Sequence, residues 1–337
     1  MSAHLPKRPI FNASAYLAAI LSAAVTLTGT VAVARAPAPP PVQAEAAVPA
    51  ARSATVTIRE DGLVADYFAV PTTAAARASA GAVIVLGGSE GGLGGSRALA
   101  RRLADEGFAA IAVSYFGEPG QSPKLDQVPI EPVGRALDWL QARPEISGPI
   151  AVMGISKGAE LALLTASRDP EIRAVVLGVP SSVVWAGIDP TGGPVGSSWT
   201  SGGQPLPYVP YDMSKGFTGI LNLYNDSLDV APAEARIPVE TINGPVMMIS
   251  GQVDGLWPSA RMAKEVEQRL KDHQFAYPVI NIIYPDAGHA AFGAILPADS
   301  PALGQATYFG GTVPGLLAAR ADGWPRVLDF LRTALNP

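Results

Sequence analysis

The sequence contains no cysteine and only three histidines, His4, His273 and His289. The absence of cysteine excludes disulfide bonds, a thiolate nucleophile and any metal site built from thiolates. Three histidines scattered along the chain cannot build a histidine-rich metal centre. The sequence therefore predicts a protein without a bound metal.

An excess of basic residues is also missing. The chain has 24 lysines and arginines against 29 acidic residues, a formal net charge of −5. Proteins that bind nucleic acids usually carry a basic patch. The phosphate-binding signature Gly-x-x-x-x-Gly-Lys-Ser/Thr is absent, and Gly92-Leu93-Gly94 lacks the spacing of a dinucleotide-binding motif. We therefore expect no nucleic-acid partner and no cofactor.

The N-terminal segment has the pattern of an export signal. Lys7 and Arg8 are followed by no further charge until Arg35, and residues 13–34 are rich in Ala, Leu, Val and Thr. Small-residue patterns suited to cleavage follow, at 32–34 or 44–46. We expect residues 1–36 to be a signal peptide, or a membrane anchor through 13–34 if the leader is not cleaved. The protein would then be exported (periplasmic or secreted), or membrane-anchored; a disordered Ala-rich leader is the alternative.

Residues 37–53 are rich in Pro and Ala and predict an extended linker. Beyond it, Asp61-Gly62 separates two strand-like segments and predicts a hairpin. Apolar strand patterns then alternate with helical ones, which indicates a mostly parallel, doubly wound α/β sheet over one domain, residues 54–337. The expected strands are 82–86, 108–113, 149–153, 174–179, 246–250 and 279–284. Residues 181–243 lack clear sheet signals and predict a lid-like insertion over the active site.

The pentapeptide Gly154-Ile155-Ser156-Lys157-Gly158 lies between the predicted strand 149–153 and a helical stretch at 159–167. Gly-x-Ser-x-Gly in this context is the nucleophile elbow of an α/β-hydrolase fold. A turn this tight needs glycine on both sides of the serine, because a Cβ there would clash. Ser156 is therefore the candidate nucleophile.

A serine hydroxyl needs a base within hydrogen-bond reach. His289 follows the last predicted strand, where catalytic groups gather in such sheets, whereas His273 lies at a charged helix end and is expected to be solvated. The base needs an acid, and Asp254 follows the preceding strand in the chain order Ser–Asp–His. Asp286, three residues before His289, is the competing acid.

Acyl transfer also needs two donors for the developing oxyanion. The backbone N–H of Lys157 should be one, and the loop after strand 82–86 should supply the other. We choose Ser89 for that donor, with Glu90 second. Glu90 and Trp185 are the candidate substrate-binding residues, although aromatic residues of the insertion could equally only pack it. The Lys157 side chain is expected to be solvated.

Five segments together resemble the hydrolase domain shared by acyl-CoA thioesterases and bile acid-CoA:amino acid N-acyltransferases. They are residues 154–163 (GISKGAELAL), 205–208 (PLPY), 237–254 (IPVETINGPVMMISGQVD), 256–259 (LWPS) and 284–289 (YPDAGH). The resemblance implies a Ser156–Asp254–His289 triad that acts on acyl thioesters through an acyl-enzyme. The transferases of this family use cysteine as the nucleophile, so Ser156 favours hydrolysis.

The sequence therefore predicts an exported serine hydrolase that cleaves a small-molecule acyl ester or thioester. A dienelactone-hydrolase-like enzyme or a peptidase could use the same triad. A non-catalytic envelope-binding protein on the same scaffold is a third possibility, which a complete and correctly ordered triad argues against. The oligomeric state does not follow from the sequence.

Overall fold

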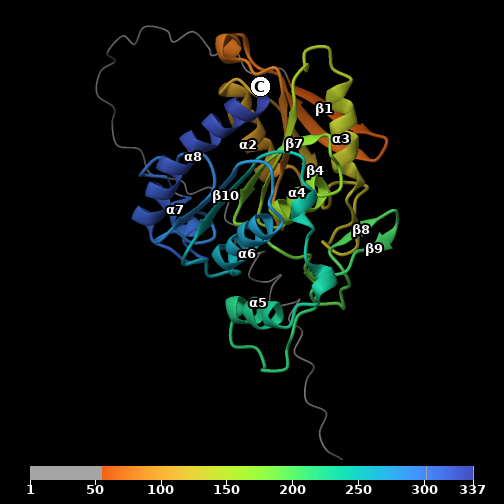
Figure 1. Cartoon of the computed structure of the whole chain (residues 1–337), viewed down its shortest axis with the longest axis vertical. Helices are drawn as coiled ribbons and strands as arrows, with labels where there is room; N and C mark the ends of the chain where they lie inside the picture. Colours follow the sequence, from red (N-terminus) through yellow and green to blue (C-terminus); the bar gives the residue numbers. More distant parts are fainter. Residues whose placement is uncertain (1–54, 301, 337) are drawn as a thin grey trace, which may run out of the picture.

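A computed structural model of the chain describes residues 55–300 and 302–336. The predicted signal segment at 1–36 and the linker at 37–53 lie outside these residues and stay predictions. An eight-stranded sheet runs through the molecule in the order β1-β2-β4-β3-β6-β7-β10-β11 (Figure 1). The strands are β1 (Thr55–Glu60), β2 (Leu63–Phe68), β3 (Ala82–Leu86), β4 (Ala109–Ser114), β6 (Ile150–Ile155), β7 (Ile172–Gly178), β10 (Val246–Gly251) and β11 (Val279–Tyr284).

The sheet is parallel from β4 to β11, and β2 pairs antiparallel with both β1 and β4. The β1–β2 hairpin turns at Asp61 and Gly62, which both have positive φ angles, as the Asp-Gly pair predicts. The strands β3, β4 and β6 are almost wholly apolar because both faces of the sheet are covered. This is the mostly parallel, doubly wound arrangement that the sequence predicts.

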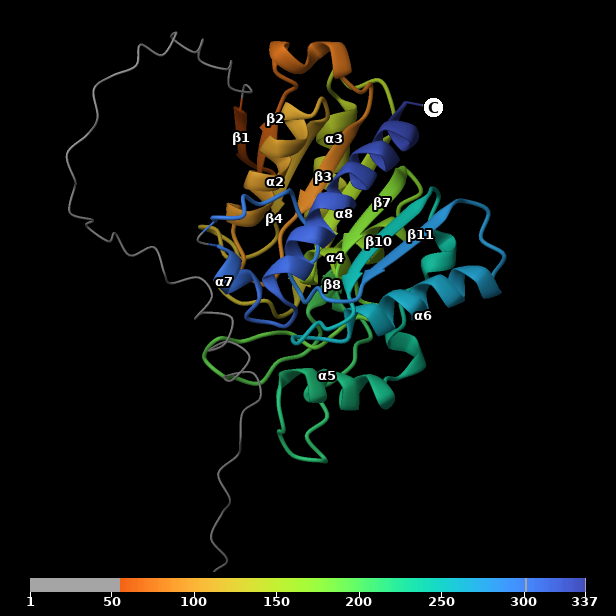
Figure 2. The same ribbon diagram turned by 90° about the vertical axis from the view of Figure 1, so that its left-hand side faces the viewer.

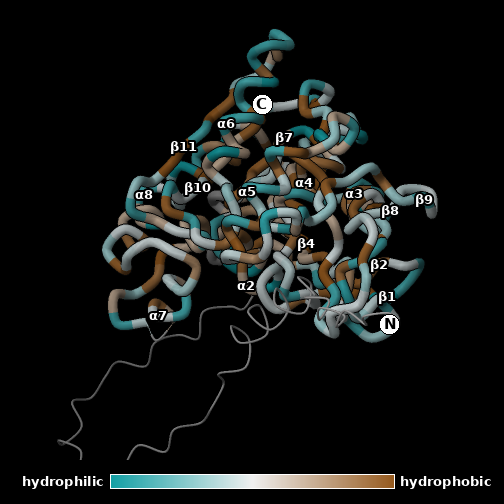
Figure 3. The backbone as a smooth tube through the Cα atoms, turned by 90° about the horizontal axis from the view of Figure 1, so that it is seen from below, coloured by the Kyte–Doolittle hydropathy of each residue, from teal (hydrophilic) through white to brown (hydrophobic). Residues whose placement is uncertain are grey.

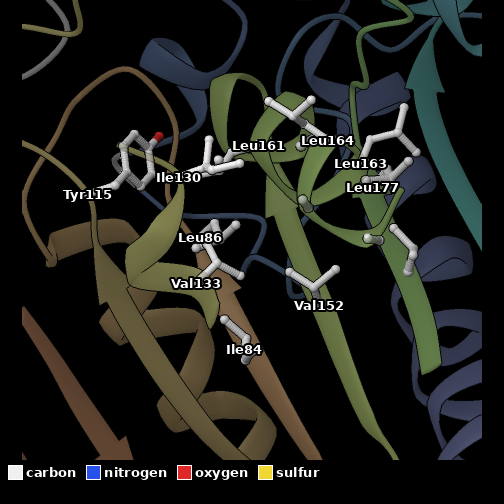
Figure 4. Packing of buried hydrophobic residues seen from close by; sticks show 14 of the residues in the cluster. Ile84, Leu86, Tyr115, Ile130, Val133, Val152, Leu161, Leu163, Leu164 and Leu177 are labelled. Atoms are coloured by element: carbon white, nitrogen blue, oxygen red, sulfur yellow. The ribbon is translucent and has the colours of Figure 1, made fainter. Parts of the chain in front are cut away.

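Two layers of helices cover the sheet, and Figure 2 shows α8 running alongside it. The helices α2 and α8 share one apolar cluster with the strands, and α3, α4 and α6 share the cluster on the other face. Figure 4 shows part of this second cluster, with Leu161 and Leu164 of α4 above Val152 of β6. The helices are α2 (Gly94–Asp105), α3 (Glu131–Gln141), α4 (Lys157–Ala166), α5 (Ile220–Asp229), α6 (Ser259–Asp272), α7 (Leu303–Ala306) and α8 (Val313–Leu335).

The insertion between β7 and β10 contains α5 and the strands β8 (Trp199–Ser201) and β9 (Gln204–Pro205). These two strands form a small second sheet with β5 (Val128–Pro129), which precedes α3 in the chain. It begins just after the carboxyl end of β7, and α5 lies at the end of the molecule opposite the C-terminus (Figures 1 and 2). Figure 3, viewed from that end, shows most of the strongly hydrophobic segments toward the interior. Short 3₁₀ turns complete the fold at Thr72–Arg77, Ala233–Ala235 and Val239–Thr241.

Candidate active site

Ser156 lies at the junction of β6 and α4 with φ 56° and ψ −120°. A positive φ is rare for residues other than glycine and stores strain at functional turns. The glycines on both sides make this turn possible. A Cβ on Gly154 would lie 2.1 Å from the Gly158 carbonyl oxygen, and a Cβ on Gly158 would lie 2.1 Å from that of Gly87. The expected reason for the two glycines is confirmed.

The structure brings Ser156, His289 and Asp254 into one hydrogen-bonded chain. His289 Nε2 lies 3.0 Å from Ser156 Oγ, and His289 Nδ1 lies 2.9 Å from Asp254 Oδ2. Asp254 follows β10 and His289 follows β11, so adjacent parallel strands deliver both groups to the carboxyl edge of the sheet.

The Asp254 carboxylate is itself held by three donors. The backbone N–H groups of Leu256 and Trp257 donate to Oδ1 at 2.9 and 3.3 Å, and Ser259 Oγ donates to Oδ2 at 2.6 Å. The side chain is buried. These bonds fix the direction in which the carboxylate faces the imidazole.

The competing histidine and acid lie elsewhere. His273 is exposed at the C-terminal end of α6, as expected for a solvated residue. Asp286 is exposed, and the contact that its backbone carbonyl makes is with the N–H of Thr312. The imidazole is therefore bonded to Asp254 and not to Asp286.

Aromatic rings enclose the imidazole of His289. Trp257 and Phe309 make edge contacts with it, with ring centroids 5.9 and 6.3 Å away. The backbone N–H of His289 also donates to the Phe309 carbonyl at 3.1 Å. A ring confined in this way keeps its orientation toward Ser156.

The loop after β3 lies against the serine. A Cβ built on Gly88 would lie 3.5 Å from Ser156 Cβ. Tyr115 Oη lies 2.7 Å from the carbonyl oxygens of both Gly87 and Gly88. Because C=O and N–H point in opposite directions across a trans peptide, the Ser89 N–H points away from Tyr115. Burial raises the pKa of Tyr115 well above its ordinary value, so the hydroxyl stays a donor.

The Lys157 backbone begins α4, and the first N–H groups of a helix lack an acceptor within the helix. The expectation that its side chain is solvated is wrong. Lys157 is 2% exposed, and its Nζ donates to Glu160 Oε2 at 2.8 Å and to Ser198 Oγ at 2.7 Å. Burial lowers the pKa of Lys157 and raises that of Glu160, and their mutual attraction opposes both shifts.

The assignment of Trp185 to substrate binding is also wrong. Its side chain is 0% exposed and its Nε1–H donates to Ser181 Oγ at 2.9 Å. Its backbone N–H donates to Glu160 Oε1, which also accepts from Trp199 Nε1 at 2.7 Å. Trp185 therefore packs the insertion against α4.

A cavity of about 280 Å³ opens beside Ser156 and His289. Ser89 and Glu90 line this cavity. No residue of 181–243 lines it. Its other walls include Arg320 and a mainly apolar set, Leu86, Leu99, Ile155, Leu256, Phe292 and Phe309.

The sequence reasoning missed Phe292, Phe309 and Arg320. Phe292 and Phe309 lie in irregular segments, and Arg320 lies on α8. The one feature of the sequence that could have indicated these residues is that they follow His289 in the chain.

Among residues 55–300 and 302–336, no three His, Asp or Glu side chains are grouped in a way that could hold a metal ion. A separate question is membrane insertion. Within the part of the chain that the structure describes, no helix combines the length and the apolar character needed to cross a membrane.

The sheet order, the serine turn and the positions of Asp254 and His289 define an α/β-hydrolase fold. A solved structure of a puromycin-hydrolyzing peptidase from Mycobacterium tuberculosis shares this fold, with a TM-score of 0.55 at 15% identity over 87% of this chain and 41% of that one. The chain belongs to the family described as BAAT / acyl-CoA thioester hydrolase C terminal, whose model matches residues 128–337. A model of the X-Pro dipeptidyl-peptidase (S15) family matches residues 41–204.

Two curated relatives are acyl-coenzyme A thioesterase 6 of Homo sapiens and of Mus musculus. The human protein is 29% identical over 265 residues and the mouse protein 30% identical over 270 residues. Each alignment covers 75% of this chain and 60% of the relative. The chain therefore spans about 60% of the length of these thioesterases.

Proposed function

We propose that this protein is a serine hydrolase that cleaves an acyl ester or thioester, with Ser156 as nucleophile, His289 as base and Asp254 as the acid that orients it. The observation that carries the proposal is the continuous chain from Ser156 Oγ through both imidazole nitrogens to Asp254, with distances of 3.0 and 2.9 Å. The strained backbone of Ser156 supports it, because such strain gathers at functional sites.

The first half of the reaction forms an acyl-enzyme. An ionised Asp254 only accepts hydrogen bonds, so the imidazole carries its proton on Nδ1 and presents Nε2 to Ser156 as an acceptor. His289 Nε2 takes the Ser156 proton while Oγ attacks the carbonyl carbon. His289 then protonates the leaving alcohol or thiol, and Asp254 stabilises the intervening imidazolium.

The oxyanion of each tetrahedral intermediate is assigned to the backbone N–H groups of Lys157 and Ser89. Both belong to segments that abut Ser156, and Tyr115 orients the second. In the second half, His289 takes a proton from water, which attacks the acyl carbon. The acid leaves, and the proton returns to Ser156 Oγ.

The acyl group is assigned to the cavity beside Ser156, because its walls are mainly apolar. Thioesters of coenzyme A are the first substrates to test, since the curated relatives are acyl-coenzyme A thioesterases. The partial match to an S15 peptidase family supports peptides as a comparison set.

The test is labelling with a fluorophosphonate probe, followed by a substrate panel of acyl-CoAs, p-nitrophenyl esters, lactones and peptides. We expect covalent labelling at Ser156, no labelling of Ser156→Ala, and slower labelling of His289→Ala by about 10³-fold or more. His273→Ala is the matched control and should label at the unchanged rate, because His273 is exposed and lies just after the end of α6. Labelling that is indifferent to His289→Ala would contradict the mechanism.

We also propose that residues 1–36 direct export. The uncharged stretch 13–34 behind Lys7 and Arg8 supports this. Cell fractionation and N-terminal sequencing of the mature protein test it. Recovery of the intact chain from the cytoplasm would contradict the proposal, whereas a cleaved N-terminus near 34 or 46 would support it.

A further inference from the structure

Three charged or titratable side chains line the cavity beside the serine: Glu90, His289 and Arg320. His289 is bonded to Asp254 and Ser156, and Glu90 Oε1 accepts the N–H of Gly88 at 3.0 Å. Arg320 takes no part in the proton transfers or in the oxyanion contacts of the proposed reaction.

The hydrogen bonds of the Arg320 guanidinium go to backbone carbonyls and not to carboxylates. Its Nε donates to the Ala290 carbonyl at 3.0 Å and its Nη1 to the Ala294 carbonyl at 3.3 Å. No Asp or Glu among residues 55–300 and 302–336 lies within ion-pair distance of it, whereas Arg326 on the same helix pairs with Asp322 at 2.9 Å. Burial lowers the pKa of Arg320 to about 10, a shift with no opposing contribution from an acid.

An uncompensated guanidinium that is half-buried is costly to the fold unless an anion joins it. A guanidinium has five N–H donors in a planar fork suited to carboxylate and phosphate oxygens, and the two carbonyls engage only Nε and Nη1. The fork is thus incompletely used, and the residue lines the same cavity as the nucleophile.

We propose that Arg320 binds an anionic group of the substrate, a carboxylate or a phosphate, inside the cavity that contains Ser156. The inference rests on the proposed hydrolase function and narrows it to esters or thioesters that carry a negative charge. The anion could belong to the acyl part, as in a half-ester of a dicarboxylic acid, or to the leaving group, as in a phosphorylated thiol.

A purely structural role predicts a different result. Arg320 also holds the segment after His289 through the carbonyls of Ala290 and Ala294. If that were its whole contribution, its loss would slow the hydrolysis of charged and neutral substrates equally. Anion binding instead makes the loss selective for charged substrates.

The experiment compares two pairs of esters, each a carboxylate and its neutral methyl ester. p-Nitrophenyl hydrogen adipate and its methyl ester differ by a charge in the acyl part. The acetyl ester of para-hydroxybenzoate and that of its methyl ester differ by a charge in the leaving group. The ratio of kcat/KM for the charged and neutral members is measured for the wild type, Arg320→Gln and Arg320→Lys, with Arg326→Gln as the control that removes one charge from the same helix outside the cavity.

We expect the wild type to prefer the charged member of one pair, and Arg320→Gln to lower that preference by about 10- to 100-fold, the range for a hydrogen bond to a charged group. Arg320→Lys keeps the charge and should retain part of the preference, and Arg326→Gln should retain all of it. The pair that responds identifies the part of the substrate that carries the anion. Thermal unfolding checks that the variants fold.

Equal losses for both members of both pairs, or a wild type without charge preference, would overturn the inference. Labelling with an uncharged fluorophosphonate separates this failure from failure of the proposed function. If the wild type is labelled at Ser156 but shows no Arg320-dependent preference, the inference about Arg320 is wrong and the proposed hydrolase function stands. A wild type that is not labelled and does not turn over any ester sinks both.

Discussion

The buried ion pair between Lys157 and Glu160 gives a prediction about the stability of the protein. Lys157→Met removes the ammonium that donates to Glu160 and Ser198, at 2.8 and 2.7 Å. Glu160 is 0% exposed and keeps its two other donors, the Trp185 N–H and Trp199 Nε1–H. The variant therefore leaves a buried carboxylate that has lost its counter-charge.

The expected magnitude follows from two opposing contributions. Unit charges 2.8 Å apart attract by about 6 kcal/mol at an effective dielectric constant of about 20. Burying each ion costs several kcal/mol, so the pair as a whole contributes little. Removal of only one partner leaves the other ion buried without a counter-charge. We therefore expect Lys157→Met to lower the free energy of unfolding by about 3–5 kcal/mol.

The assay is urea unfolding followed by tryptophan fluorescence, since Trp185 and Trp199 both bond to Glu160. The double variant Lys157→Met/Glu160→Gln removes both charges, so its loss should be smaller than the sum of the two single losses by about 2 kcal/mol. Lys215→Met is the matched control. It removes an ammonium from a 2.7 Å pair with Asp226 in which the lysine side chain is 63% exposed, and should leave the free energy of unfolding almost unchanged.

Two results would refute this reasoning. A loss below about 1 kcal/mol for Lys157→Met would mean that water or a rearranged side chain compensates Glu160. Strictly additive losses in the cycle would mean that the two charges are not coupled, despite their separation of 2.8 Å.

Three further predictions concern the site. Asp254→Asn should lower kcat by about 10⁴-fold with KM little changed, because the amide cannot hold the His289 tautomer; an ester assay that shows less than about 10-fold would contradict this. Tyr115→Phe removes the donor to the loop after β3 and should lower the labelling rate about 10-fold at unchanged fold, as judged by circular dichroism. Gly158→Ala should destabilise the protein by about 3 kcal/mol in urea unfolding, since its Cβ would lie 2.1 Å from the Gly87 carbonyl oxygen; wild-type stability would mean that the turn can relax.

The parts of the fold that the sequence predicted are those controlled by local patterns. The strand β6, the two glycines and the start of α4 are adjacent in the chain, and their geometry follows from sterics within a few residues. The positions of Asp254 and His289 follow from a topological rule, because parallel strands end at one edge. The sequence of the insertion carries only a weak helical pattern around 219–224, although α5 extends from Ile220 to Asp229.

The errors fall where burial depends on distant segments. The Lys157 side chain was expected to be solvated, but Ser198 and Trp199, some forty residues away in the sequence, cover Lys157 and Glu160. The same packing places Trp185 in the interior and away from the cavity. A single sequence contains no direct sign of such long-range contacts.

No residue of the insertion lines the cavity beside Ser156. Residues 181–243 were expected to lie over the active site, and two of them, Trp185 and Ser198, bond to the buried Lys157–Glu160 pair and do not line the cavity beside Ser156. The opposite side of the site is built by the segment after His289 and by α8, which supply Phe292, Phe309 and Arg320. The partners of the Lys157–Glu160 pair and the wall of the cavity thus come from different parts of the chain. Substitutions of Trp185 or Ser198 should therefore alter stability and kcat for all substrates alike, and substitutions in the cavity wall should alter the choice among substrates.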